Sequence, residues 1–185
     1  MTFNPAPVRI VRRRNPPLRD ARENANMEEH PMKKYKIYLE TTLFNFYFDT
    51  DREAHADTVR LFAEIAAGKH EAFTSEAVIW ELRDAHSPKR EKMLSLIDEY
   101  GIKTLPVGNE ARNLADFYVE QKIISPKYKT DAIHIAVATV NKLDYIISMN
   151  FQHIVNQKTR RMTDSAHGLK GYSTIAIISP MEPII

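Results

Sequence analysis

The chain has 185 residues, 43% of them hydrophobic, and no cysteine. This length suits one well-packed domain, and the lack of cysteine excludes disulfides, zinc–thiolate sites and cysteine nucleophiles. No apolar run reaches the roughly 20 residues that span a membrane, and the N-terminus has no apolar signal-peptide core, so we expect a cytoplasmic protein that does not associate with a membrane.

Residues 1–31 differ in composition from the rest of the chain. They hold five of the ten prolines, and their six arginines exceed their four acidic residues by two, which equals the net charge of the whole chain. Proline-rich sequence without apolar periodicity does not pack a core. We therefore expect a disordered leader or an extended start at 1–31 and a folded domain at 32–185. A basic arm that touches RNA is one interpretation of the leader, and translation from Met32 is another.

Strands and helices are expected to alternate along the folded domain. Short apolar, β-prone runs predict strands at 35–39, 71–74, 102–107, 143–147 and 174–179. Helices are predicted between them at 43–48, 53–67, 76–82, 88–100, 109–122 and 131–140. Residues 151–173 are polar and basic, and no element is predicted there. Alternation without hairpins indicates an α/β fold with a mainly parallel sheet and right-handed crossovers.

Polar residues mark several of the predicted helix starts. Thr130 is expected to cap the helix 131–140, Ser75 or Thr74 the helix 76–82, and Asn109 the helix 109–122. The helix 131–140 carries an apolar stripe, which consists of Ile133, Ala136, Val137 and Val140. This spacing predicts that one face of that helix packs on the core.

Three carboxylates and an amide lie at the ends of predicted elements. Glu40 ends the first strand, Glu81 follows the second by about one helical turn, Asp131 begins a helix, and Asn150 ends the fourth strand. If the first and fourth strands are neighbours at the point where the strand order reverses, all four side chains project into one crevice. Clustered carboxylates repel unless a cation compensates them. Oxygen ligands without cysteine select Mg²⁺ or Mn²⁺, and such an ion can promote phosphodiester hydrolysis.

Each of these four residues also has a simpler interpretation. Glu40 could end a strand in solvent, and Glu81 could lie on the exposed side of an amphipathic helix. Asp131 could only complement the helix dipole, and Asn150 could serve the turn after a strand. The metal-site hypothesis therefore depends on their joint placement at the carboxyl ends of strands.

Four segments resemble the PIN domain, the metal-dependent ribonuclease fold of VapC-type toxins in bacterial and archaeal toxin–antitoxin pairs. They are KIYLETT at 36–42, TSEAVIWEL at 74–82, DAIHIAVA at 131–138 and DYIISMNFQHI at 144–154. The family pattern has an acid with a following hydroxyl, a Ser and a Glu six residues apart, an Asp that opens a helix, and a Thr/Ser-x-Asp/Asn that closes the fourth strand. The matching residues are Glu40 with Thr42, Ser75 with Glu81, Asp131, and Ser148 with Asn150.

The resemblance implies a fold, an activity and partners. The fold is a three-layer α/β/α arrangement around a mainly parallel five-stranded sheet. The activity is that of a Mg²⁺- or Mn²⁺-dependent endoribonuclease, a toxin restrained by a cognate antitoxin, with catalytic and metal-binding roles for Glu40, Glu81, Asp131 and Asn150. Thr42, Ser75 and Ser148 support them. RNA is the implied substrate, the antitoxin is a protein partner, and a homodimer is left open.

Two departures from the family pattern keep other functions open. The first acid is usually Asp and is Glu40 here, and the fourth is often Asp and is Asn150 here. A one-metal site, reduced activity, or a non-catalytic PIN-fold module that binds RNA or protein would accommodate them. A phosphate-binding receiver-like domain is a weaker alternative, because Ser179-Pro180 occupies the place where its lysine is expected.

Basic residues near the proposed crevice are candidates for phosphate contacts. They are Lys127, Lys129, Lys158, Arg160 and Arg161. Solvated basic loops are the alternative. His134 and His153 are expected to pack or to support the ligands, since hard cations prefer oxygen.

The aromatic run after the first strand has a structural and a functional interpretation. It consists of Phe44, Phe46, Tyr47 and Phe48. These rings could stack on RNA bases, but four aromatics within five positions favour a buried aromatic core or a groove for an antitoxin helix.

The composition of the leader leads to a first prediction. Because residues 1–31 are proline-rich and lack periodicity, the protein truncated to 32–185 should fold with an unchanged melting temperature in differential scanning calorimetry. A loss of several degrees would show that the leader packs on the domain.

Overall fold

The computed structural model describes residues 33–185, so the predicted leader at 1–31 lies outside the described residues. The described part forms one five-stranded sheet with strand order β3-β2-β1-β4-β5. All four strand pairings are parallel. The strands are β1 (Tyr35–Leu39), β2 (His70–Ser75), β3 (Lys103–Leu105), β4 (Tyr145–Ile147) and β5 (Ala176–Ile178).

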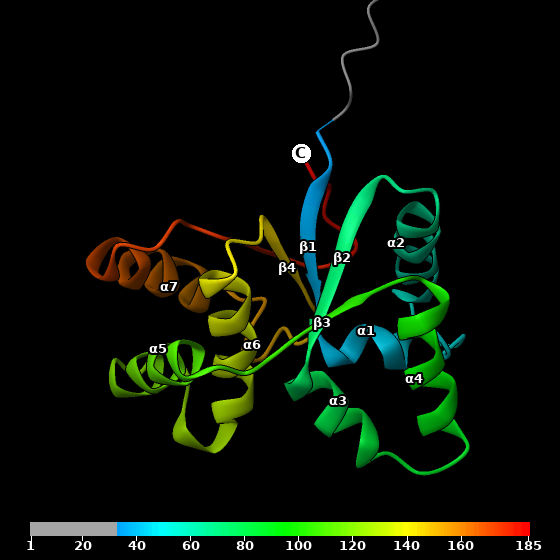
Figure 1. Ribbon diagram of the computed structural model, residues 1–185, viewed down its shortest axis with the longest axis horizontal. Coiled ribbons are helices and arrows are strands. Elements are labelled where there is room, and N and C mark those ends of the chain that lie inside the picture. Colours follow the sequence, from blue (N-terminus) through cyan, green and yellow to red (C-terminus); the bar gives the residue numbers. More distant parts are fainter. Residues whose placement is uncertain (1–32) are drawn as a thin grey trace, which may run out of the picture. The chain divides into compact units, whose positions relative to one another are not determined.

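Helices cover both faces of the sheet, with α1 to α4 on one side and α5 to α7 on the other (Figure 1). Their bounds are α1 (Thr41–Phe46), α2 (His55–Ala66), α3 (Glu76–Arg83), α4 (Lys89–Glu99), α5 (Asn109–Glu120), α6 (Lys129–Val140) and α7 (Gln157–Lys170), with a 3₁₀ turn, η1, at Pro126–Tyr128. This arrangement confirms the predicted three-layer α/β/α fold. Within residues 33–185, none of the helices is long and apolar enough to cross a bilayer.

Strand β1 is the centre of the sheet because it pairs with β2 on one side and β4 on the other. Ile37, Tyr38 and Leu39 have no exposed surface, as expected for a strand covered on both faces. The ladder continues past β1, since the amide of Glu40 donates to the carbonyl of Ile147 at 3.1 Å. The strand order reverses between β1 and β4, and ligands of parallel sheets bind outside the carboxyl ends at such a point.

Helix α6 is buried on more sides than its sequence predicted. Seven of its twelve residues are buried: Ala132, His134, Ile135, Ala136, Val137, Ala138 and Thr139. Ile133 and Val140, the two ends of the predicted apolar stripe, are only half-buried. All four residues of the stripe lie in the core or pack against it, so the predicted packed face is confirmed. The buried surface of α6 is broader than the stripe because α6 contacts both α5 and β4.

Two of the three predicted helix caps were wrong. Helix α6 begins at Lys129, so Thr130 lies inside it, and α5 follows Gly108 with Asn109 as its first residue. Ser75 is the N-cap residue of α3, as predicted, but its side chain makes no capping hydrogen bond. Its hydroxyl is 2.6 Å from the hydroxyl of Tyr38 instead, because a buried tyrosine hydroxyl needs a partner.

Helix α7 lies in the polar segment for which no element was predicted. Its buried residues are Thr159, Thr163, Ala166 and His167. Three of these four are polar, so the buried face lacks the apolar periodicity by which amphipathic helices are recognised. Asn156 caps the helix by accepting a hydrogen bond from the amide of Thr159 at 2.8 Å, and Gly171 ends it with φ of 75°.

Part of the aromatic run after β1 belongs to the core. Phe44 has no exposed surface and packs edge-on against Phe62, with ring centroids 6.0 Å apart. Tyr47 is half-buried, and its hydroxyl lies 2.7 Å from that of Tyr100. These contacts tie α1 to α2 and to the end of α4, and so they fix the helix that follows Glu40.

The burial of His167 predicts a pH dependence of stability. His167 is fully buried, its Nε2 lies 2.6 Å from the hydroxyl of Tyr118, and its Nδ1 has no hydrogen-bond partner within residues 33–185. Burial lowers its pKa below the ordinary 6.5, and the charge of Asp164 offsets this only in part. Because His167 takes up a proton at higher pH in the unfolded chain than in the folded protein, the unfolded chain binds more protons as the pH falls. The free energy of unfolding should therefore fall between pH 7 and pH 5.

The variant His167→Gln isolates this contribution. Chemical denaturation at pH 7 and pH 5 should give a smaller fall in unfolding free energy for His167→Gln than for the natural protein. The exposed His86 provides the control, since His86→Gln should keep the full fall. An equal fall in all three proteins would contradict the assignment to His167.

Candidate metal centre

Glu40 is the most buried carboxylate of the site. It follows β1 directly and is 3% exposed. Its Oε2 accepts hydrogen bonds from the Thr42 hydroxyl at 2.5 Å, the Thr42 amide at 3.2 Å and the Ser148 hydroxyl at 2.7 Å. Glu40 is thereby the N-cap of α1, and hydroxyl groups from the first turn of α1 and from the residue after β4 stabilise its charge. Thr42 and Ser148 contact Glu40 as supporting groups would.

Glu81 belongs to a chain of hydrogen bonds that starts in the core. Its Oε2 accepts from the Thr41 hydroxyl and lies 3.1 Å from Nε2 of His134. Nδ1 of His134 lies 2.8 Å from the hydroxyl of Tyr38, and that hydroxyl also contacts Ser75. Tyr38, Ser75 and His134 have no exposed surface. The chain therefore fixes Glu81 from inside the protein.

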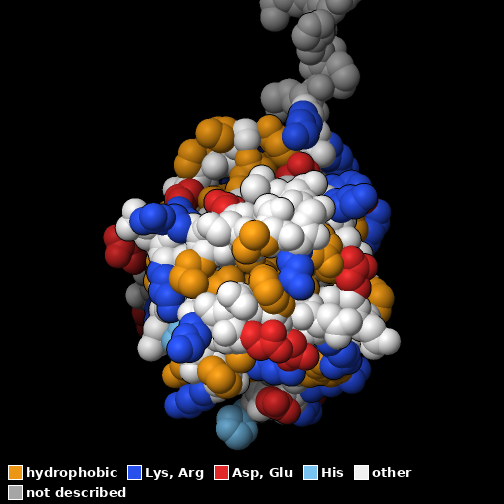
Figure 2. All heavy atoms as spheres, turned by 90° about the vertical axis from the view of Figure 1, so that its left-hand side faces the viewer, with side chains coloured by type: hydrophobic (Ala, Val, Ile, Leu, Met, Phe, Trp, Pro, Cys, Tyr) orange, Lys and Arg blue, Asp and Glu red, His pale blue; other side chains and the backbone are white. Residues whose placement is uncertain are grey.

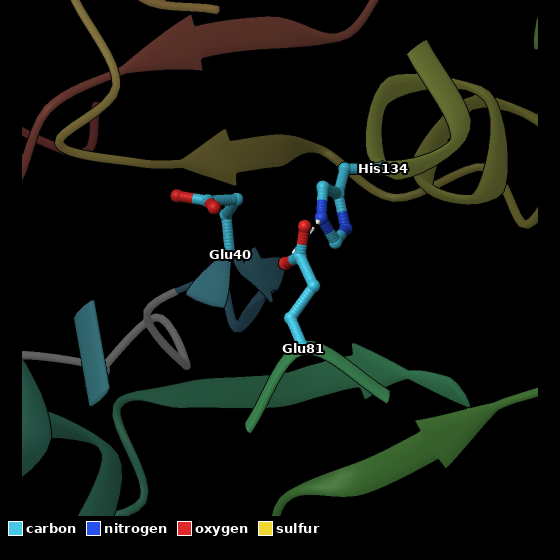
Figure 3. A group of neighbouring side chains, drawn as sticks. All are labelled: Glu40, Glu81 and His134. Carbon is cyan, nitrogen blue, oxygen red and sulfur yellow. Dashed lines mark hydrogen bonds and ion pairs between the residues drawn. The ribbon is translucent and has the colours of Figure 1, made fainter. Parts of the chain in front are cut away.

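Glu40, Glu81 and His134 converge at the carboxyl ends of the strands. One ligand atom from each lies within 4.8 Å of the others. Figure 3 shows Glu81 and His134 pointing toward each other, with Glu40 beside them at the end of its strand. The sheet topology explains the convergence, because β1 supplies Glu40, the helix after β2 supplies Glu81, and the helix before β4 supplies His134.

Asp131 lies in the first turn of α6, one helical turn before His134. Its Oδ2 is buried without a hydrogen-bond partner among residues 33–185. Burial, together with the negative charges of Glu40 and Glu81, raises its pKa to about 6, against the opposing influence of His134 and His153. A buried carboxylate oxygen without a donor is costly, and a cation would satisfy it.

Asn150 differs from the other three predicted ligands. Its side-chain Oδ1 accepts a hydrogen bond from the backbone amide of His153 at 3.0 Å. Its backbone amide donates to the hydroxyl of Ser148 at 2.9 Å. The side chain thus stabilises the turn after β4. Ser148 also donates to Glu40, so Asn150 is linked to Glu40 through the Ser148 hydroxyl and lies at the edge of the cluster.

The charges of the cluster influence each other. Burial by itself lowers the pKa of His134, but the hydrogen bond to Glu81 and the charges of Glu40, Glu81 and Asp131 outweigh it, so the pKa is raised. Burial by itself raises the pKa of Glu81, but the contacts with His134 and Thr41 bring it below its ordinary value. The cluster therefore attracts positive charge.

The basic residues proposed for RNA have different surroundings. Arg160 forms a two-pronged ion pair with Glu182, at 3.1 and 2.7 Å, and Lys129 pairs with Asp116. Lys127 lies over the ring of Tyr128, 5.4 Å from its centroid. Arg161 lines a surface pocket of about 370 Å³ on α7. On the face shown in Figure 2, Lys and Arg side chains are dispersed with acidic side chains between them, and they form no single basic patch.

Tyr38 and Thr41 complete the site but were not singled out in the sequence. Tyr38 stands within a buried strand, where its hydroxyl requires a polar partner, and this requirement was the available signal. Thr41 was hidden in the Glu40-Thr41-Thr42 run, in which only Thr42 matched the family pattern. His134 was noticed, and its distance of three residues from Asp131 places both on one side of α6.

Comparison with known families assigns the chain. The pattern of the PIN domain matches residues 37–153, which is more than half of the chain and includes every predicted metal ligand. The chain belongs to the PIN-domain family. No curated protein matches its sequence.

Solved structures with the PIN fold resemble this protein only distantly. VapC20 of Mycobacterium tuberculosis, described as a toxin that cleaves the sarcin–ricin loop, is 15% identical over 63% of this chain and 92% of its own, with a TM-score of 0.46. VapBC2 of Rickettsia felis bound to promoter DNA is 12% identical over 78% and 98%, with a TM-score of 0.46. DNA-bound VapBC of Salmonella typhimurium is 13% identical over 79% and 98%, with a TM-score of 0.49.

The environment of Asp131 predicts that replacing its carboxylate by a neutral amide does not destabilise this PIN domain. Because the folded-state pKa of Asp131 is raised from 3.8 to about 6, ionised Asp131 destabilises the metal-free protein above that pH. Asp131→Asn should therefore have an equal or higher melting temperature at pH 7.5 in EDTA. The gain should vanish near pH 4, where the natural carboxyl is protonated.

Thermal unfolding with and without the substitution checks this expectation. Asp98, which is exposed on α4, supplies a control: Asp98→Asn should leave the melting temperature within about 1 °C of the natural protein, as surface changes usually do. A clear loss of stability in Asp131→Asn at pH 7.5 would mean that ionised Asp131 is stabilised by contacts within the fold.

Proposed function

We propose that this PIN-domain protein is a metal-dependent endoribonuclease, the toxin of a toxin–antitoxin pair. The observation that carries the proposal is the convergence of Glu40, Glu81 and His134 within 4.8 Å at the strand ends. The charges of all three act on Asp131, whose Oδ2 has no hydrogen-bond partner in the described part of the chain. Family membership supplies the reaction class, and the buried carboxylates supply the site.

The donor set fits a divalent cation. Glu40, Glu81 and Asp131 would hold Mg²⁺ or Mn²⁺ through carboxylate oxygens, which these hard ions prefer. Bound there, the ion would supply Lewis-acid activation of water and neutralisation of charge on the phosphodiester. Asn150 is a weaker ligand candidate, because its amide oxygen already accepts the amide hydrogen of His153.

The protein's own groups keep the carboxylates in place for this chemistry. Thr42 and Ser148 donate to one oxygen of Glu40, and Thr41 and His134 contact one oxygen of Glu81. Each carboxylate is therefore fixed through one oxygen. Rigid placement of this kind is what preorganised electrostatic catalysis requires.

Phosphate contacts would come from the basic residues that flank the site in sequence. Among residues 33–185, Lys127 and Arg161 form no ion pair with a carboxylate, whereas Lys129 and Arg160 do. Lys127 and Arg161 are therefore the better candidates for holding the RNA backbone, and Lys129 and Arg160 would first have to leave Asp116 and Glu182. Such contacts position the chain without reading its sequence.

A non-catalytic module that binds RNA or protein is the second candidate. The engagement of Asn150 in the turn after β4 favours it, because this residue contributes no charge and its side-chain oxygen already accepts a hydrogen bond. Metal-dependent cutting separates the two functions, since the module would bind RNA and leave it intact.

The decisive prediction concerns cleavage of RNA by the purified protein. With Mn²⁺ the natural protein should cut single-stranded RNA, and EDTA should abolish the cutting. Asp131→Asn should lower the cleavage rate by about 100-fold or more, in the range of a lost electrostatic contact in an active site. Gel analysis of labelled RNA under single-turnover conditions measures the rate.

Asp98→Asn serves as the matched control and should keep the natural rate. Cleavage that persists in both EDTA and Asp131→Asn would exclude this mechanism and indicate a contaminating nuclease. If the RNA stays intact with every protein but binds in a gel-shift assay, the result would favour the non-catalytic binding module over the nuclease.

A further inference from the structure

We propose that Nε2 of His134 is itself a metal ligand, so that the centre of this protein adds one imidazole to its carboxylates. The inference rests on the proposed function, since it assigns an additional residue to the same metal. It differs from the all-oxygen site implied by the sequence, in which His134 had a supporting role.

The spacing of the ligand atoms is the first argument. In an octahedral centre with bonds of about 2.1 Å, neighbouring ligand atoms are about 3 Å apart and opposite ones about 4.2 Å apart. Nε2 of His134 lies 3.1 Å from Oε2 of Glu81, and the whole group with Glu40 stays within 4.8 Å. The hydrogen-bonded pair thus already has the separation of two neighbouring ligands.

The second argument is the support behind the imidazole. Metal-binding histidines are oriented by a hydrogen bond to their other ring nitrogen. Nδ1 of His134 lies 2.8 Å from the Tyr38 hydroxyl, which is 2.6 Å from the Ser75 hydroxyl. All three side chains are fully buried, so the ring has no freedom to turn away from the cluster.

This hydroxyl pair allows either tautomer of His134. When Nε2 carries the hydrogen and donates to Glu81, Tyr38 donates to Nδ1 and Ser75 donates to Tyr38. When Nδ1 carries the hydrogen, Tyr38 accepts it and donates to Ser75, because both hydroxyls can act in either direction. The second arrangement leaves the Nε2 lone pair free toward the position between Glu81 and Glu40, without adding or removing a proton overall.

A nitrogen ligand changes the metal preference. Imidazole suits transition metals, whereas Mg²⁺ prefers oxygen alone. The protein should therefore bind Mn²⁺ more tightly than Mg²⁺, and His134→Gln should weaken Mn²⁺ binding by at least about 10-fold while changing Mg²⁺ binding less.

Pulsed electron paramagnetic resonance of the untagged full chain with Mn²⁺ tests the assignment. The natural protein should show the ¹⁴N coupling of a directly bound imidazole, and labelling with ¹⁵N-histidine should replace it by a ¹⁵N coupling. His134→Gln should lose the coupling. His153 is the other histidine whose charge acts on Asp131, so His153→Gln is the matched control. This variant should keep the ¹⁴N coupling.

Tyr38→Phe tests the support separately. It keeps the imidazole but removes the hydroxyl behind Nδ1, so it should retain the ¹⁴N coupling and weaken Mn²⁺ binding by about 10- to 100-fold. Bound Mn²⁺ without ¹⁴N coupling in the natural protein would overturn the inference and leave the carboxylate site of the proposed nuclease intact. No Mn²⁺ binding at all would overturn both.

Discussion

The burial of like charges at one end of the sheet is the constraint on which this structure depends. Glu40 is almost fully buried, and Glu81 and Asp131 influence each other and Glu40 through their charges. Burying ionised carboxylates together is unfavourable unless donors or cations compensate them. The fold provides hydroxyl donors for Glu40 and an imidazole for Glu81. Among residues 33–185 it provides no donor for Oδ2 of Asp131, an oxygen that a bound cation would satisfy.

The central position of β1 makes this compensation possible. Because β1 pairs with β2 and β4, its end lies beside the helix that follows β2 and the helix that precedes β4. Tyr38 is the residue before the last one of β1. Its hydroxyl contacts Ser75 at the end of β2 and His134 in α6. Glu40 and Thr41, the two residues after β1, follow: Glu40 lies in the cluster and the Thr41 hydroxyl donates to Glu81. Strand β1 and the two residues after it therefore supply or contact all the side chains that form the cluster of Glu40, Glu81 and His134.

Much of the fold could be predicted because its strands are short, apolar and separated by helices. The placement of Glu40 after β1 and of Asp131 in the first turn of α6 followed from the same pattern. Helix α7 could not be predicted, since its buried face consists mainly of Thr159, Thr163 and His167. The contact between Tyr38 and His134 spans 96 positions and depends on tertiary packing, which local sequence patterns do not report.

The two departures from the family pattern have a common physical consequence. Glu40 is one methylene longer than Asp, and its carboxylate reaches back to cap α1 through Thr42 while still joining the cluster. Asn150 removes one negative charge and fastens the turn before His153. Asn150 leaves the site with one negative charge fewer than four clustered acids would have, and both side chains are hydrogen-bonded within the fold. Such a site is less repulsive without metal, and in the metal centre proposed above His134, which Tyr38 holds through Nδ1, would complete the set of ligands.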